Sequence, residues 1–262
     1  MTDKNFDKLA TKFAKNIYGT PKGDIRTAIL KRDLFEIIPQ LKHGGLRILD
    51  AGGGFGHLSQ QLAAMGNQVV LCDISEQMLA LAKEQIQQAD NALDIELIHS
   101  SIQQLDVTQL GLFDLILCHA VAEWLTDAQQ TLTELLQLLK PQGHFSLMFY
   151  NKEAQRFHSL VSGNFEYVEA GLTAKKTVGL TPQYPMYIEQ VEQWFEGWRC
   201  EIKCQSGVRV IHDYLKPYPD QKIDTDKLLQ MELTYSRKHP YISLGRYVHF
   251  IGLNQSHFEH SY

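Results

Sequence analysis

Long hydrophobic runs are missing from this chain of 262 residues. The longest apolar stretches, such as residues 115–118 and 145–150, fall far short of the ~20 residues that a membrane-spanning helix needs. The first eight residues alternate in charge and hold no apolar core of a secretory signal. The four cysteines are too few for a disulfide framework. We therefore expect a soluble, cytoplasmic protein with no membrane partner.

An excess of positive charge is also missing, since 25 Lys and Arg stand against 30 Asp and Glu. Such a balance disfavours non-specific binding to duplex DNA, which depends on neutralising phosphates, and no DNA partner is expected. The charge is unevenly spread, however, because residues 1–42 hold nine basic and five acidic side chains. A local basic surface built from this segment and the second half of the chain stays compatible with the composition.

Short apolar runs alternate with helix-like segments through the first 150 residues. The predicted strands are residues 46–50, 68–73, 95–99, 113–118 and 144–150. Predicted helices cover residues 57–64, 75–86 and 126–139, and Lys140-Pro141-Gln142-Gly143 is expected to stop the last one. Alternation of this kind, with nearly continuous apolar strands, is typical of a parallel sheet covered on both faces. The sequence predicts a doubly wound, Rossmann-like α/β fold.

The two ends of the chain differ from this pattern. Residues 4–41 read as two helices broken at residues 18–23, and the second closes near Pro39. Residues 151–185 are mixed in character, a helix is predicted over 187–196, and strand-like segments at 199–211 and 241–253 are expected to pair antiparallel at the sheet edge. We predict one domain over residues 1–262, made of a helical N-terminal cap (1–42), a core (43–150), and an insertion with edge strands (151–262).

A glycine-rich turn follows the first predicted strand. Residues 49–56 read Leu-Asp-Ala-Gly-Gly-Gly-Phe-Gly, so Gly52, Gly54 and Gly56 alternate after Asp50. A turn of this kind between a strand and a helix lets a ligand approach bare backbone beside a helix N-terminus, although it can also be a tight turn without a ligand. The nicotinamide fingerprint needs a glycine where His57 stands, which disfavours an NAD-dependent oxidoreductase.

Asp73 ends the second predicted strand, 17 residues beyond Gly56. A carboxylate at that place can accept both hydroxyls of a ribose, or cap the helix that begins near Ser75, or do both. Together with the glycine turn and the Leu138–Gly143 helix stop, this arrangement resembles the class I S-adenosylmethionine (SAM)-dependent methyltransferases over residues 45–150. The resemblance implies SAM as the cofactor.

The resemblance also implies which positions contact the cofactor. The glycine turn would lie against the methionine part, the strand-end acid would hold the ribose, residues after the third strand would flank the adenine, and the end of the fourth strand would face the methyl donor. The corresponding residues are Gly52, Gly53, Asp73, Ser101, Ile102, Gln103 and His119. His119 could instead be an ordinary buried histidine.

Segments along nearly the whole chain resemble a narrower family, the CmoM-type tRNA 5-carboxymethoxyuridine methyltransferases. These segments are Asn5-Phe6, Asn16-Ile17-Tyr18-Gly19-Thr20, Lys22-Gly23, Glu123-Trp124, Ser146 to Asn151, Gly163-Asn164-Phe165, Gly207 to Val210, His212 to Leu215, Pro240 to Ile242 and Leu244 to Tyr247. The resemblance implies methyl-ester formation on the carboxylate of 5-carboxymethoxyuridine at the tRNA wobble position, with the anticodon loop as partner. It also implies that Arg26 contacts SAM, although an isolated helix arginine is more commonly a surface residue.

The same resemblance points to substrate contacts in the second half. Arg209 and Arg246 would meet phosphates, Tyr214 and Tyr247 would stack on unpaired bases, and Tyr150 is a further candidate. The alternative is that these residues belong to edge strands, with the arginines exposed or paired to acids. Lys175-Lys176 could contact tRNA or form a solvated loop.

The implied nucleophile is a carboxylate, which has a pKa of about 4 and is ionised near neutral pH. No general base is then needed, and we predict no catalytic acid or base. We also predict no metal site, because the Cys200 and Cys204 pair lacks a second ligand pair. Two other functions stay open, a SAM-dependent methyltransferase of a small carboxylic acid or quinone, and a non-catalytic RNA-binding module. The oligomeric state is not predicted.

Overall fold

A seven-stranded sheet forms the centre of the computed structural model, which describes residues 20–173, 182–216 and 223–256. Its strands are β1 (Arg47–Ala51), β2 (Gln68–Asp73), β3 (Ile95–His99), β4 (Phe113–His119), β5 (Leu139–Tyr150), β6 (Cys200–Val208) and β7 (Tyr247–Asn254). Their order is β3-β2-β1-β4-β5-β7-β6. β1 to β5 are parallel, while β7 runs antiparallel to both β5 and β6. The predicted parallel sheet with an antiparallel edge pair is confirmed.

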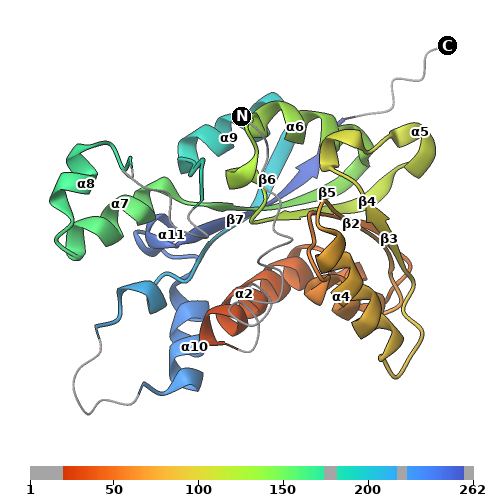
Figure 1. Cartoon of the computed structure of the whole chain (residues 1–262), viewed down its shortest axis with the longest axis horizontal. Coiled ribbons are helices and arrows are strands. Elements are labelled where there is room, and N and C mark those ends of the chain that lie inside the picture. Colours follow the sequence, from red (N-terminus) through yellow and green to blue (C-terminus); the bar gives the residue numbers. More distant parts are fainter. Residues whose placement is uncertain (1–19, 174–181, 217–222, 257–262) are drawn as a thin grey trace.

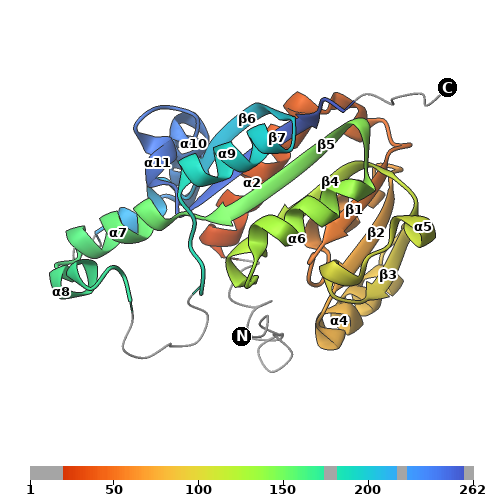
Figure 2. The same ribbon diagram turned by 90° about the horizontal axis from the view of Figure 1, so that it is seen from above.

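Helices cover both faces of the sheet (Figures 1 and 2). On one face, α2 (Pro21–Ile37) and α3 (His57–Ala63) pack against Leu115 and Leu117 of β4. On the other, α6 (Ala128–Leu135) and α9 (Ile188–Gly197) pack against Ile116 of the same strand. Successive strand residues point to opposite faces, so one continuous apolar strand serves two cores. The doubly wound arrangement is confirmed.

Further helices extend the fold. They are α4 (Glu76–Gln87), α5 (Val107–Leu110), α7 (Lys152–Val161), α8 (Phe165–Glu169), α10 (Thr225–Tyr235) and α11 (Tyr241–Leu244). α10 packs beside α2 on the same side of the sheet (Figure 1). No helix among the described residues is both long and apolar enough to cross a membrane.

The second helix predicted in the N-terminal cap is α2. Pro21 occupies its first turn, where the missing N–H costs nothing, and the Thr20 side chain accepts a hydrogen bond from the Gly23 amide at 3.3 Å. The helix ends at Ile37, just before Pro39, as predicted. It packs on the sheet and buries Ile25, Ile29, Leu30 and Leu34. The first predicted helix lies outside the described residues.

Three local predictions are wrong. The helix expected over 126–139 ends at Leu135 and a 3₁₀ turn follows, while the residues from Lys140 to Gly143 lie within an irregular stretch of β5. The strand expected from residue 241 begins at Tyr247, because Tyr241–Leu244 is a helical turn. The strand expected over 199–211 ends at Val208, where Arg209 takes a positive φ of 62°. Runs of four residues carry too little periodicity to separate a turn of helix from a strand end.

Candidate cofactor pocket and the adjoining arginine cluster

A pocket that opens to solvent lies where β1, β2, β3 and β4 end. The carboxyl ends of parallel strands meet at one edge, and the chain order reverses there between β1 and β4, where ligands of such sheets bind. The structure brings all the predicted cofactor residues to its wall: Arg26, Gly52, Gly53, Asp73, Ser101, Ile102, Gln103 and His119. Their contacts with a cofactor stay predictions.

The glycine turn has no room for side chains. Gly52 has a φ of 77°, and a Cβ there would lie 2.6 Å from Val121 Cγ2. A Cβ on Gly53 would lie 2.5 Å from the carboxyl carbon of Asp50. The amides of Gly52 and Gly53 both donate to the Cys72 carbonyl, at 2.8 and 3.2 Å. The turn is therefore held by β2 and presents bare backbone to the pocket, which fits a cofactor that approaches closely.

Asp73 ties the glycine turn to the start of α4. Its Oδ2 accepts a hydrogen bond from the Gly54 amide at 2.8 Å, and its Oδ1 accepts one from the Ser75 amide at 2.8 Å. The N-cap of α4 is Ser75, whose hydroxyl accepts from the Met78 amide at 3.2 Å. Each carboxylate oxygen has a second lone pair, so Asp73 can hold the turn and still accept ribose hydroxyls.

Asp50 is a pocket residue to which the sequence analysis gave no role. It is buried behind the glycine turn, and the Ser59 hydroxyl donates to its Oδ2 at 2.6 Å. Burial raises the pKa of Asp50 to about 6, and the nearby Asp73 adds to that effect, whereas the Ser59 hydrogen bond and Arg26 oppose it. The signal in the sequence was its place two residues before Gly52.

Arg26 reaches the pocket from α2 and is not a free surface arginine. One of its terminal nitrogens donates to the His119 carbonyl at 3.5 Å, and its guanidinium carbon lies 6.0 Å from the centre of the Tyr247 ring. The helix therefore places a cation in the pocket wall, where a planar guanidinium can meet a carboxylate.

His119 lies at the end of β4 and lines the pocket, but one ring nitrogen is already engaged. Its Nε2 is 2.8 Å from the Ser146 hydroxyl. Burial, with the nearby His249 and Arg26, holds the pKa of His119 well below its usual value. The ring is therefore neutral, and it is both a buried, hydrogen-bonded histidine and a pocket residue.

The predicted substrate residues gather around one acid. Asp213 Oδ2 lies 3.2 Å from Arg209 Nε and 2.7 Å from Arg246 Nε, and Arg246 donates to the Tyr150 hydroxyl at 3.0 Å. We call Tyr150, Arg209, Asp213 and Arg246 the Asp213 cluster. Burial alone would raise the pKa of Asp213, but a hydrogen bond with His212 and the two guanidinium groups hold it well below its usual range. Both arginines are thus paired to an acid, the alternative weighed above.

Tyr214 and Glu232 fix the loop that carries Arg209. The Tyr214 hydroxyl donates to the Leu244 carbonyl at 2.8 Å. The buried carboxylate of Glu232 accepts three backbone amides, from Val210 at 2.7 Å, Ile211 at 3.0 Å and His212 at 2.7 Å. The sequence analysis missed Glu232, because no local pattern links an acid on α10 to amides about 20 residues earlier.

Tyr247 joins the pocket to the Asp213 cluster. Its ring centre lies 6.0 Å from the Arg26 guanidinium carbon, 5.6 Å from that of Arg209 and 5.3 Å from the Tyr150 ring centre, in an edge-on arrangement. Substrate held at the cluster would therefore lie beside the cofactor pocket. The pair Lys175-Lys176 lies outside the described residues.

The two cysteines dismissed as metal ligands are buried thiols. Burial raises the pKa of Cys200 to about 12 and that of Cys204 to about 11. Across the residues that the structure describes, no three His, Cys, Asp or Glu side chains stand where they could hold a metal ion together.

Comparison with known proteins adds three findings. Residues 49–147 match a family described as a methyltransferase domain. The tRNA 5-carboxymethoxyuridine methyltransferase of Escherichia coli (strain K12) is 44% identical over 251 residues, which cover 95% of each chain. A ubiquinone biosynthesis O-methyltransferase of Aromatoleum aromaticum is 31% identical over 140 residues, which cover 53% of this chain and 54% of that protein.

Among solved structures, the magnesium protoporphyrin IX methyltransferase of Synechocystis PCC 6803 with bound SAH (S-adenosylhomocysteine) has a TM-score of 0.65. It is 16% identical, and the match covers 95% of this chain and 96% of that one. Identity this low shows a common fold and no more. The same fold therefore extends beyond the methyltransferase core into the second half.

Proposed function

This chain belongs to the tRNA 5-carboxymethoxyuridine methyltransferases, within the class I SAM-dependent methyltransferases, and from that premise we propose its reaction. The protein transfers the methyl group of SAM to the carboxylate of 5-carboxymethoxyuridine at the tRNA wobble position, and the product is the methyl ester. The tRNA anticodon loop is the proposed partner, and the cytoplasm is the proposed location.

One observation supports the choice of substrate, namely the share of this chain that each relative covers. The tRNA-modifying relative covers 95% of the chain, including the residues after 147 that the methyltransferase domain family does not match. The ubiquinone-pathway relative covers only 53%. Residues outside the cofactor core are the ones available to select a substrate, so the tRNA substrate is favoured over a quinone or a small carboxylic acid.

The pocket fits SAM by the chemistry of its wall. Gly52 and Gly53 offer backbone without side chains, Asp73 supplies a carboxylate for hydroxyl groups, and Arg26 adds a guanidinium to the same wall. Ile102 adds an apolar wall, as an adenine ring requires. When bound, SAM supplies an electrophilic methyl group on a sulfonium centre.

The residues of this chain contribute by orienting the two reactants and by excluding water. A carboxylate nucleophile is ionised near neutral pH and has no proton to lose. This agrees with a pocket in which Asp50 lies behind the glycine turn and His119 is bonded to Ser146. Holding two reactants in line supplies roughly 7–11 kcal/mol of a barrier of this kind.

The Asp213 cluster suits a nucleophile that must stay reactive. A free pair of arginines would clamp the substrate carboxylate and lower its nucleophilicity. Here Asp213 balances one of the two positive charges of Arg209 and Arg246. The remaining charge and the hydroxyls of Tyr150 and Tyr247 can orient the modified uridine without neutralising it completely.

The test uses purified protein, SAM with a labelled methyl group, and tRNA that carries 5-carboxymethoxyuridine. We expect label in the nucleoside methyl ester, identified by mass spectrometry of digested tRNA. The matched control is the same tRNA with unmodified uridine at the wobble position, which should take no label. Equal labelling of both tRNAs would refute the substrate, and labelling of small carboxylic acids with neither tRNA labelled would favour the metabolite alternative.

A further inference from the structure

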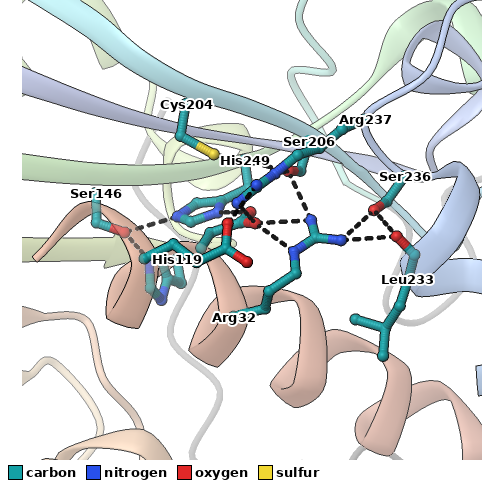
Figure 3. Close-up of polar contacts among 11 residues, drawn as sticks. Arg32, His119, Ser146, Cys204, Ser206, Leu233, Ser236, Arg237 and His249 are labelled. Carbon is teal, nitrogen blue, oxygen red and sulfur yellow. Dashed lines mark hydrogen bonds and ion pairs between the residues drawn. The ribbon is translucent and has the colours of Figure 1, made fainter. Parts of the chain in front are cut away.

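A buried chain of hydrogen bonds runs from the wall of the cofactor pocket to α2. His119 Nε2 is 2.8 Å from Ser146 Oγ, Ser146 Oγ is 2.8 Å from His249 Nε2, and His249 Nδ1 is 2.8 Å from Asp33 Oδ2. In Figure 3 the Ser146 hydroxyl bonds the rings of both His119 and His249, and His249 lies toward the guanidinium groups of Arg32 and Arg237. Asp33, Ser146 and His249 have no exposed surface.

The acid at the far end of this chain is ionised. Asp33 Oδ1 lies 3.0 and 2.7 Å from two nitrogens of Arg32 and 2.6 Å from one of Arg237. Burial alone would raise the pKa of Asp33, but the hydrogen bond with His249 and the neighbouring positive charges hold it well below its usual range. An ionised carboxylate only accepts hydrogen bonds, so His249 Nδ1 carries a proton.

The neighbouring charges decide whether the His249 ring is neutral or positively charged. The positive charges of Arg32 and Arg237 are matched by two carboxylates, Asp33 and the exposed Glu36 that also pairs with Arg237. A third positive charge on the fully buried His249 would therefore lack a partner. His249 is therefore neutral, and its Nε2 is an acceptor. A cationic His249 would donate from Nε2, and this would reverse the direction of the hydrogen bonds from His249 to Ser146 and from Ser146 to His119.

The direction of each remaining bond follows from the number of protons. The Ser146 hydroxyl has one hydrogen, and the bare Nε2 of His249 requires it. Ser146 Oγ can then only accept from His119, so His119 Nε2 carries the proton of that neutral ring. His119 Nδ1 is left as a bare acceptor.

From this polarity we infer that Asp33, His249 and Ser146 are positioning residues, which hold His119 as a hydrogen-bond acceptor at the cofactor pocket. His119 lines the pocket, and within residues 20–173, 182–216 and 223–256 its Nδ1 has no hydrogen-bond partner. The group that it takes is a donor, and the ammonium of the methionine part of SAM is one. A substrate carboxylate only accepts, so His119 does not hold the nucleophile away from the methyl group.

The inference rests on the cofactor site and not on the choice of tRNA. It can therefore be tested without any RNA and without turnover. Ligand-free protein labelled with ¹⁵N-histidine is examined at pH 8 by long-range ¹H–¹⁵N correlation, and the His119 signals are assigned with His119→Gln. We expect a protonated Nε2 and a bare Nδ1 at His119. A proton on Nδ1 in the wild-type protein would overturn the inference.

Asp33→Asn is the most informative variant, because the surrounding residues fix the orientation of the new side-chain amide. The three guanidinium N–H groups need an oxygen at the position of Oδ1, so the amide nitrogen faces His249. That nitrogen donates, which reverses the chain and moves the proton of His119 to Nδ1. We expect the reversed tautomer and an affinity for S-adenosylhomocysteine, measured by calorimetry, that falls about tenfold or more.

Two serines provide a matched pair. Ser146→Ala breaks the chain, so both tautomers of His119 should appear and the affinity should fall severalfold. Ser206 is equally buried and bonds Arg32 and Arg237, but it lies outside the chain, so Ser206→Ala should leave the tautomer and the affinity unchanged. A folded Ser146→Ala protein with both properties of the wild type would refute the inference, even if Asp33→Asn fails to fold.

Discussion

The cofactor pocket and the Asp213 cluster lie side by side. The contacts within each region, however, join residues at different separations along the sequence. In the pocket, Asp73 binds the amide of Gly54, and Asp50 binds Ser59 nine residues away. In the cluster, Arg246 binds Tyr150 across 96 residues. Local motifs are thus enough to build the glycine turn and its acids. Arg26, by contrast, reaches the pocket across 93 residues, and the substrate side needs the completed sheet, with β7 inserted between β5 and β6.

The two regions also treat charge differently. The pocket presents bare backbone to a ligand at Gly52 and Gly53, while the cluster balances one of its two positive charges with Asp213 before any ligand arrives. Variants in the cluster should therefore affect folding and tRNA methylation, and variants in the pocket should affect cofactor binding. Each prediction below separates these two outcomes.

The largest expected effect belongs to Asp213→Asn. It leaves Arg209 and Arg246, which are only 17% and 13% exposed, without their shared acid. Loss of one partner from a buried pair is strongly unfavourable, and the partial exposure of the arginines reduces the cost to about 2–4 kcal/mol of unfolding free energy. Chemical denaturation measures this. Glu153→Gln, in an exposed pair with Arg156, is the control and should cost below about 1 kcal/mol.

Gly52→Ala should weaken cofactor binding by about 2–3 kcal/mol, because the new Cβ meets Val121 and distorts the glycine turn. Gly163→Ala is the control, since Gly163 has nearly the same φ, 76° against 77°, and nothing within 4 Å of its Cβ position. The control shares the backbone strain of about 1–2 kcal/mol but not the clash. Calorimetry with S-adenosylhomocysteine should separate them, and equal affinities would contradict this account of the turn.

Asp73→Ala should weaken SAM binding by about 1.5–3 kcal/mol, the range for hydrogen bonds to a charged group. The variant also frees the amides of Gly54 and Ser75, so folding must be confirmed by thermal unfolding. A folded variant with the wild-type affinity would remove Asp73 from the cofactor site. Methylation of tRNA at saturating SAM should recover, because the Asp213 cluster is untouched.

The smallest effect concerns Glu123, which is fully buried and directly precedes the pocket residue Trp124 in sequence. Neither carboxylate oxygen has a hydrogen-bond partner within the described part of the chain. Burial raises the pKa of Glu123 from 4.5 to about 7. The folded state then binds its proton more tightly than the unfolded state, so stability falls as the pH rises from about 4.5 to 7.

Glu123→Gln removes this ionisation and should stabilise the protein at pH 8 by about 1–3 kcal/mol, with little change at pH 4.5. Urea denaturation at both pH values checks the difference. A variant that is less stable than wild type at pH 8 would mean that the ionised carboxylate has a stabilising role that the described contacts do not contain.

The same difference between local and distant contacts decided what the sequence could predict. The strands and the glycine turn are local patterns, and they led correctly to the sheet and to the pocket residues. The pairing of Arg246 with Asp213, and the contact of Asp33 with His249 across 216 residues, depend on strand order and could not be read from spacing. Arg209 and Asp213, by contrast, are only four residues apart. One missed element did carry a local signal, since Ala154, Phe157 and Val161 recur at helical spacing in α7.

The central claim is that this protein forms the methyl ester at the tRNA wobble uridine. Mass spectrometry of nucleosides in tRNA from cells that lack the protein tests it most directly. The account predicts that the methyl ester of 5-carboxymethoxyuridine disappears, that free 5-carboxymethoxyuridine rises by the same amount, and that the gene for the intact chain restores the ester. Unchanged ester in the cells without the protein would contradict the claim.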